Sequence, residues 1–395
     1  MHMKRWLMTI AALGVGLMAM SAAQAAEPVK IGFSISKTGL FAAGTGSQMD
    51  TYELWKDEVN AAGGLDVKGV KRPIVFDYYD DQSDPSKAVQ IYEKLITQDK
   101  VDLLLAPWGT PMHIAVAGIA ERYKFPIVGN SAASVKLREI KSNYMWFTTA
   151  EMPDRFAHAL TALLKSVHKT KVALIANQLP FALEVRSYLV PDLEKAGFKI
   201  AVNEAYPPGI KDMTSLLTEV KAAKPDAVLA LTYPADTSLY MKQARELGID
   251  APFQMVLIGA TESWFPKEFG AAANGIVTMA HWAPRKEWPK AQAFFDAYEK
   301  KFHEAPDYLD SALAYMSCEI LQQAVAKVGL DRVAIRNMIA THTFETINGP
   351  VKFKGPENIT TPAGIVQIQG KNMELIWPPS IETAKFMPKP AWPAH

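Results

Sequence analysis

The chain has 395 residues, of which 49% are hydrophobic and 21% charged, and its formal net charge at pH 7 is +1. This length exceeds what one hydrophobic core usually holds, so two lobes are expected. The 42 basic and 41 acidic residues form no long block of one sign, which excludes the electrostatic footprint of a protein that binds nucleic acid or anionic lipid.

The first residues have the features of a secretory signal. Lys4–Arg5 precede the apolar run Leu7–Met20, and Ala23–Ala25 then supplies the small-residue pattern that signal peptidase accepts. The alternative is a membrane anchor, but the run is shorter than the roughly 20 residues of a spanning helix. We therefore expect residues 1–25 to be a cleaved signal peptide. The single cysteine, Cys318, excludes an internal disulfide and is expected to be a small buried hydrophobe.

From Val29 onward, short apolar runs alternate with longer helical patterns, which is typical of βα units around parallel sheets. In the first series we expect strands at Val29–Ser34, Ile74–Tyr79, Val101–Ala106 and Pro126–Val128, and helices at Gly46–Ala62, after Pro85, and at His113–Tyr123. In the second series we expect strands at Lys171–Ala176, Lys199–Tyr206, Ala227–Thr232 and Phe253–Ile258, and helices at Ala182–Ala196, Met213–Ala223 and Thr237–Leu247.

The order of these elements predicts an α/β protein with two Rossmann-like lobes, each built on a parallel sheet. Long helical patterns at Glu287–His303 and Ser311–Val328 are expected to pack back on the first series, which makes the first lobe discontinuous. We expect lobe 1 at 26–147 plus 281–348 and lobe 2 at 148–280 plus 349–395, joined by a hinge of three crossings near Phe147–Glu151, Val277–Trp282 and Ile347–Lys352.

Signatures of catalysis are absent from the sequence. It contains no GxSxG, no GxxxxGK[ST] and no HExxH, and its eight histidines are scattered. The GxG at Gly44–Gly46 is not followed by a third glycine, because Met49 occupies that position. We therefore expect no catalytic residues, no metal site and no cofactor.

Small polar residues follow the third and fourth strands of the first series. In open α/β sheets, ligands bind beyond the carboxyl ends of the strands. Trp108, Gly109 and Thr110 precede a helix, where free backbone N–H groups and a hydroxyl could receive a carboxylate, and Ser131–Ser134 occupies the corresponding place after the next strand. The alternative is that these hydroxyls only cap helices.

Aromatic residues occupy the corresponding strand ends of the second series. Phe181, Tyr233 and the segment Gly259–Trp264 each follow a strand, and His281–Trp282 lies near the second crossing. An aromatic at a strand end is often ordinary packing, and Trp282 could simply cover the hinge. Because aromatic residues follow three strands at the same edge of the predicted sheet, we favour the interpretation that they form a wall of the ligand site.

The sequence resembles the type I periplasmic binding proteins that serve ABC importers, in particular the branched-chain amino acid (Leu/Ile/Val) subgroup. The resemblance covers nearly the whole chain after the signal. It is found in the order and spacing of Lys30–Phe41 (KIGFSISKTGLF), Val59–Gly64 (VNAAGG), Tyr79–Ala88 (YDDQSDPSKA), Pro126–Ser134 (PIVGNSAAS), Gln243–Gly248 (QARELG) and Ile347–Phe353 (INGPVKF).

This resemblance implies a role for particular residues. The carboxylate-binding loop of the family is similar to Gly109-Thr110, helped by Ala132 and Ser134. The aromatic residues that close from the second lobe match Phe181, where the amino-acid binders commonly have tyrosine, and Tyr233. The acidic partner of a ligand ammonium is similar in placement to Glu262, with Thr261 as the rival, whereas the family's aromatic near Gly44 is absent. Further candidates are Trp108, Trp282, Tyr308 and Asp310.

The resemblance implies a periplasmic substrate-binding component of an ABC importer, with the membrane permease subunits as partners, no enzymatic activity, and a monomeric state. If Glu262 faces the cleft, its charge would select an α-amino acid, because a desolvated ammonium must be paired; the expected ligand is then an apolar or branched-chain amino acid. If it does not, the aromatic wall suits an aromatic or aliphatic carboxylate. A ligand sensor with the same lobes is the remaining alternative.

Overall fold

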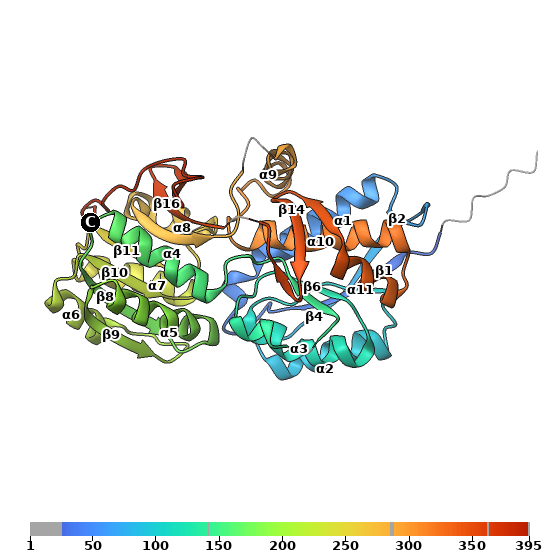
Figure 1. Ribbon diagram of the computed structural model, residues 1–395, viewed down its shortest axis with the longest axis horizontal. Helices are drawn as coiled ribbons and strands as arrows, with labels where there is room; N and C mark the ends of the chain where they lie inside the picture. The colour runs from blue at the N-terminus through green and yellow to red at the C-terminus, as the bar shows by residue number, and fades with distance from the viewer. Residues whose placement is uncertain (1–25, 141, 285–287, 362, 394–395) are drawn as a thin grey trace, which may run out of the picture.

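The computed structural model describes residues 26–140, 142–284, 288–361 and 363–393. The signal expected at residues 1–25 lies outside this part of the chain. Two α/β lobes lie side by side along the long axis of the molecule (Figure 1). Across the described segments, no helix combines the length and the apolarity needed to span a bilayer.

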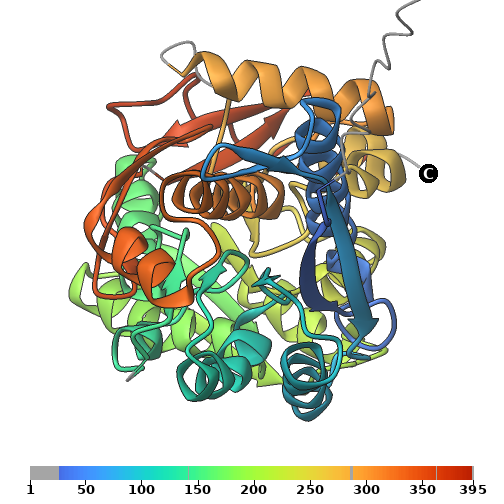
Figure 2. The same cartoon turned by 90° about the vertical axis from the view of Figure 1, so that its right-hand side faces the viewer.

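The first lobe is built on two parallel strand groups. The strand β1 (Val29–Ile35) lies between β4 (Ile74–Asp80) and β5 (Leu103–Leu104), and β6 (Ile127–Gly129) pairs in parallel with β7 (Met145–Phe147). Helices cover both sides, as the end-on view shows (Figure 2). They are α1 (Gly46–Ala61), α2 (Pro85–Thr97), α3 (Thr110–Tyr123), α9 (Pro289–Phe302), α10 (Asp310–Val328) and α11 (Arg332–Thr341).

The expected elements of the first series are confirmed, with ends shifted by a few residues. The start of α2 shows the local cause: Pro85 occupies the first helical turn, and the Asp84 side chain accepts a hydrogen bond from the backbone N–H of Ser86 at 2.8 Å. The hairpin β2 (Leu65–Val67) and β3 (Val70–Arg72) and the helix α11 were not expected from the sequence.

The third crossing lies later in the chain than the sequence predicted. The strands β13 (Thr343–Thr346), β14 (Gly349–Lys354) and β15 (Glu357–Asn358) join the sheet of β6 and β7 in the order β13-β14-β15-β7-β6. Residues 349–358 therefore belong to the first lobe, not to the second, and the chain crosses between Asn358 and Gly364. The other two crossings follow β7 and β12 (Ile276–Ala280), close to the predicted positions.

The second lobe contains one seven-stranded sheet in the order β17-β16-β12-β11-β10-β8-β9. Its parallel strands are β8 (Lys171–Asn177), β9 (Lys199–Tyr206), β10 (Ala227–Leu231), β11 (Phe253–Val256) and β12, and the antiparallel pair β16 (Gly364–Gln369) and β17 (Asn372–Trp377) extends one edge. The helices are α4 (Pro153–Ser166), α5 (Pro180–Lys195), α6 (Thr214–Ala223), α7 (Pro234–Glu246) and α8 (Trp264–Phe269). All strands expected here are confirmed; α4 and α8 were not expected.

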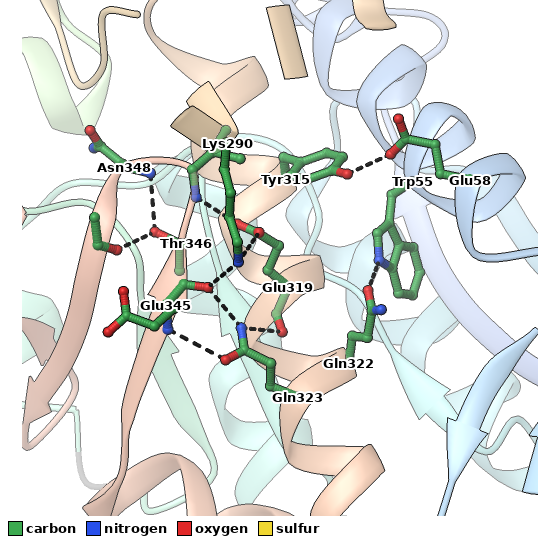
Figure 3. Close-up of polar contacts among 12 residues, drawn as sticks. Trp55, Glu58, Lys290, Tyr315, Glu319, Gln322, Gln323, Glu345, Thr346 and Asn348 are labelled. Carbon is green, nitrogen blue, oxygen red and sulfur yellow. Dashed lines mark hydrogen bonds and ion pairs between the residues drawn. The ribbon is translucent and has the colours of Figure 1, made fainter. Parts of the chain in front are cut away.

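Helix α10 anchors the returning part of the chain in the first lobe (Figure 3). Glu319 on this helix accepts a hydrogen bond from the Ile347 backbone N–H at 2.8 Å, and its other oxygen lies 3.4 Å from Lys290 Nζ. Gln322 accepts a hydrogen bond from the indole of Trp55 on α1 at 2.8 Å. Cys318 is buried on the same helix, as expected. The network fixes α1, α9 and β13 around one buried helix.

Candidate ligand-binding site

A cavity lies between the two lobes, where strands of both sheets end. The space between its walls is about 380 Å³, part of which is open to solvent, so the cavity is small in this closed arrangement. It is lined from the first lobe by Trp108, Gly109, Thr110, Ser131, Ala132, Ala133, Leu309, Asp310 and Leu313, and from the second lobe and the crossing after β12 by Phe181, Tyr233, Ile258, Met279 and His281.

The first-lobe wall is a backbone cradle at the N-terminus of α3. Gly109 caps this helix with φ +87°, a conformation that favours glycine, and its N–H donates to Ser131 Oγ at 3.2 Å. Thr110 Oγ1 accepts from the Ala133 N–H at 3.1 Å and donates to the Ala133 carbonyl at 3.3 Å. The two loops are thus fixed against each other beside a helix N-terminus, whose partial positive charge favours an anion.

Buried polar groups hold Ser131 in this cradle. Its hydroxyl donates to Gln48 Oε1 at 2.7 Å, and Gln48 Nε2 donates to the carbonyls of Ala106 and Pro107 at 3.1 and 3.2 Å. Ser134, in contrast, lies outside the cavity lining, and its hydroxyl accepts from the Lys136 N–H at 3.1 Å. Among the predicted cradle residues, Ser134 therefore has the capping role that was the alternative interpretation.

The opposite wall is aromatic and aliphatic. Phe181 lies in the first turn of α5 and Tyr233 caps α7, so both immediately follow parallel strands, β8 and β10. The ring of Phe41 in the first lobe lies 5.4 Å from the Trp108 ring and 6.2 Å from the Tyr233 ring, measured between centroids. Aromatic side chains therefore extend from one lobe to the other, and the sequence had not singled out Phe41.

Asp310 places a carboxyl group in the cavity wall. Its Oδ2 accepts a hydrogen bond from Trp108 Nε1 at 2.8 Å. Burial, together with the neighbouring charge of Asp307, raises the pKa of Asp310 well above its usual value. The carboxyl group also fixes the indole plane of Trp108.

His281 lies on the crossing segment after β12. Its backbone N–H donates to the Tyr308 carbonyl at 2.9 Å, and its carbonyl accepts from Asn348 Nδ2 at 2.9 Å. The ring is buried in the cavity wall, and Nδ1 has no hydrogen-bond partner among the described residues. Burial lowers the pKa of His281 to about 3, so the imidazole is neutral at physiological pH.

Glu262, Thr261 and Trp282 do not line this cavity. Glu262 Oε2 accepts from Trp264 Nε1 at 2.9 Å, and with Thr261 it lines a separate pocket beside β16 and β17. Burial and the charge of Asp307 raise the pKa of Glu262. Trp282 packs edge-on against Phe294 and donates to the Ile347 carbonyl at 3.4 Å, so it covers the hinge.

The lobes contact each other across the mouth of the cleft, so the arrangement is closed. The backbone N–H of Val135 in the first lobe donates to Glu184 Oε1 on α5 of the second lobe at 2.8 Å. Lys267 of the second lobe pairs with Glu304 of the first at 2.7 Å. A Cβ built on Gly44 would lie 3.1 Å from Pro234 Cγ of the second lobe. Direct contacts between the lobes thus narrow the opening of the cavity.

A family model described as periplasmic binding protein matches residues 28–372 of this chain. The chain belongs to the periplasmic binding protein family. "Leu/Ile/Val-binding protein homolog 7" of Brucella suis biovar 1 (strain 1330) is 24% identical over 351 residues, covering 85% of this chain and 86% of the relative. A "leucine-, isoleucine-, valine-, threonine-, and alanine-binding protein" of Pseudomonas aeruginosa is 24% identical over 335 residues, covering 84% of this chain and 87% of the relative.

Solved structures share the fold of this binding protein. A branched-chain amino acid transporter substrate-binding protein from Streptococcus pneumoniae, in complex with isoleucine, has a TM-score of 0.79 and 24% identity, covering 88% of this chain and 98% of its own. An ABC-transporter solute-binding protein from R. palustris, in complex with benzoate, has a TM-score of 0.78 and 20% identity, covering 92% and 98%. The chain therefore has the type I periplasmic binding protein fold that the sequence predicted.

Sequence reasoning missed several aliphatic residues of the cavity. Ile258 and Met279 end or follow strands of the second lobe, and Leu309 and Leu313 belong to the start of α10. Their apolar side chains have the same pattern as core residues, so no sequence signal separates them from the core. The position of Ile258 directly after β11 was the one available indication.

Proposed function

We propose that this binding protein captures a small, predominantly apolar carboxylate in the periplasm and, in its closed form, presents it to the membrane subunits of an ABC importer. The observation that supports this most directly is the pairing of two walls. The N-terminus of α3 and the Ser131–Ala133 loop face a cavity whose other sides are aromatic and aliphatic. An anion at the cradle leaves the rest of the ligand in apolar surroundings.

The position of Glu262 favours an acid without an α-ammonium group. An ammonium removed from water needs an ionised partner. Glu262 is bonded to Trp264 and lies outside the cavity lining, and the pKa of Asp310, the one carboxyl group in the lining, is raised by burial. These positions support an anion at the cradle, and among the residues that line the cavity they leave Asp310 as the only carboxyl group that could pair with a cation.

An apolar or branched-chain amino acid is the second candidate. The relative from Brucella suis is named as a Leu/Ile/Val-binding protein homolog, and the relative from Pseudomonas aeruginosa as a leucine-, isoleucine-, valine-, threonine- and alanine-binding protein. Asp310 supplies the specific structural observation: its carboxyl group lies in the cavity wall, and a ligand ammonium beside it would lower its pKa and pair with it. The two candidates differ by a single ligand group.

Closure around the ligand follows from the contacts on both sides of the cavity. Because a bound solute touches residues of both lobes, it stabilises the closed arrangement over the open one, which is a shift in population. Permease subunits that recognise the closed form would then distinguish the ligand-bound protein from the unbound protein. We propose that the protein acts as a monomer; a sensor role would be indicated if a pull-down recovered a receptor instead of permease subunits.

The deciding experiment compares leucine with 4-methylpentanoate, which has the same side chain and no amino group. The mature protein is unfolded to remove co-purified ligand, refolded, and titrated calorimetrically with this pair and with benzoate, while thermal shifts are recorded in parallel. Tighter binding of 4-methylpentanoate or benzoate than of leucine supports the proposal. Tighter binding of leucine establishes the second candidate, and no binding of any acid refutes both. Mass spectrometry of the co-purified molecule gives an independent answer.

A further inference from the structure

His281 is the polar residue of the cavity wall that the carboxylate site leaves unused. Its backbone is fixed on both sides, by the Tyr308 carbonyl and by the Asn348 side chain, so the ring is held in place. No described residue bonds to Nδ1. Buried polar atoms in native proteins almost always have a hydrogen-bond partner. An unpaired ring nitrogen in the wall of a binding cavity therefore indicates that a ligand group pairs with it.

The surroundings of the ring define what this ligand group is. Met279 and Leu309 line the same cavity, and Asp310 is already engaged by Trp108 through one oxygen. The imidazole is neutral, because burial lowers the pKa of His281 to about 3. Depending on the tautomer, Nδ1 of a neutral imidazole either donates or accepts a hydrogen bond, and a hydroxyl group can pair with it in both cases.

We infer that His281 determines specificity by hydrogen-bonding a hydroxyl group on the apolar body of the ligand, so that the preferred ligand is a hydroxylated carboxylic acid and not the unsubstituted acid. This inference rests on the proposed function, since the carboxylate must occupy the cradle of α3. Discrimination by such a site is expected to be strong, because the analogue without the hydroxyl leaves a buried polar group unpaired.

The first test needs no variant. Dissociation constants are measured by calorimetry for benzoate against 3-hydroxybenzoate and 4-hydroxybenzoate, and for pentanoate against 5-hydroxypentanoate. The inference expects at least one hydroxylated acid to bind about tenfold more tightly than its parent. If the parents bind and no hydroxylated acid is preferred, the inference is overturned and the proposed function stands. If no acid of either kind binds, the proposed function fails and the inference with it.

The second test assigns the preference to His281. His281→Phe removes both ring nitrogens and retains a planar ring, and it should abolish the preference, measured as the ratio of the dissociation constants of the parent and the hydroxylated acid. His281→Gln retains a side chain that both donates and accepts, so it should restore part of the preference. His342→Phe, at an exposed histidine beyond α11, is the control and should retain it. If folded His281→Phe keeps the preference, His281 does not have this role. If the variant does not fold, the first test on the unmodified protein still decides whether hydroxylated acids are preferred.

Discussion

The contact between Gly44 and Pro234 allows closure to be perturbed at a residue that does not itself line the cavity. Gly44 lies in the short helix Ala42–Gly44 of the first lobe, and Pro234 begins α7 in the second. A Cβ on Gly44 would lie 3.1 Å from Pro234 Cγ and 2.9 Å from Trp108 Cζ2, both closer than side-chain carbons normally approach. We predict that Gly44→Ala weakens ligand binding, because the added methyl group meets Pro234 only in the closed form.

The magnitude follows from the cost of overpacking. An extra methyl group in a well-packed contact costs about 1–3 kcal/mol, which corresponds to a dissociation constant raised roughly 5-fold to 150-fold. Gly46→Ala, two residues later, is the matched control, because a Cβ there has no heavy atom within 4 Å. Calorimetric titration of ligand-free protein measures the dissociation constant, and thermal unfolding without ligand measures the part of the cost that arises within the first lobe at Trp108.

A second substitution distinguishes the contact of the new methyl group with Pro234 from its contact with Trp108. Pro234→Ala removes the Cγ that meets the new methyl group, so the double variant Gly44→Ala/Pro234→Ala should regain most of the lost affinity. Displacement of Trp108 would not be reversed in this way. Equal dissociation constants for Gly44→Ala and Gly46→Ala would refute the reasoning, since they would show that the lobes do not approach at this point when ligand is bound.

Three further outcomes are expected. Thr110→Ala should weaken carboxylate binding by about 1–3 kcal/mol, because the Ala133 N–H loses its acceptor, whereas Thr110→Ser should not; equal titration curves for the two variants would contradict this. Glu184→Ala should raise the ligand dissociation constant about fivefold through loss of the contact with Val135, with the unliganded melting temperature unchanged. Burial raises the pKa of Glu319 from 4.5 to about 7, so its contribution to stability is present below pH 4.5 and is lost as the pH rises through 7. The free energy of unfolding, measured with denaturant, should therefore fall by up to about 3 kcal/mol between pH 5 and 8.5, and Glu319→Gln should remove this fall.

The strands could be predicted from the sequence because their burial is nearly complete. The run Lys171–Asn177 is buried over almost its whole length, and such a continuous apolar run bounded by turn residues is the signal of a strand covered on both faces. The strand β14, Gly349–Lys354, alternates buried and exposed residues. That pattern shows a strand with one solvent face but does not show which sheet it joins, so the third crossing was misplaced.

The sequence could predict those residues of the candidate site whose position is set by the end of a strand, but not those whose position is set by the conformation of a turn. Residues that follow parallel strands, such as Thr110, Phe181 and Tyr233, lie at the cavity because the strands of each lobe end on the side that faces the other lobe. Glu262 also follows a strand, but the turn begins at Gly259 with φ +106°, and the carboxylate bonds to Trp264. The direction of a side chain within a turn depends on such local conformations and on tertiary partners, which the sequence pattern does not show.

The burial of the single thiol has a practical consequence for following ligand capture in real time. Cys318 lies inside α10, and burial raises its pKa well above the usual range, so it should not react with maleimides under native conditions. A cysteine introduced at Leu183, which is 36% exposed on α5 beside the rim contact of Glu184, would then be labelled selectively. An environment-sensitive dye at that position would turn the protein into an optical sensor for its own solute, with every native residue of the cavity intact.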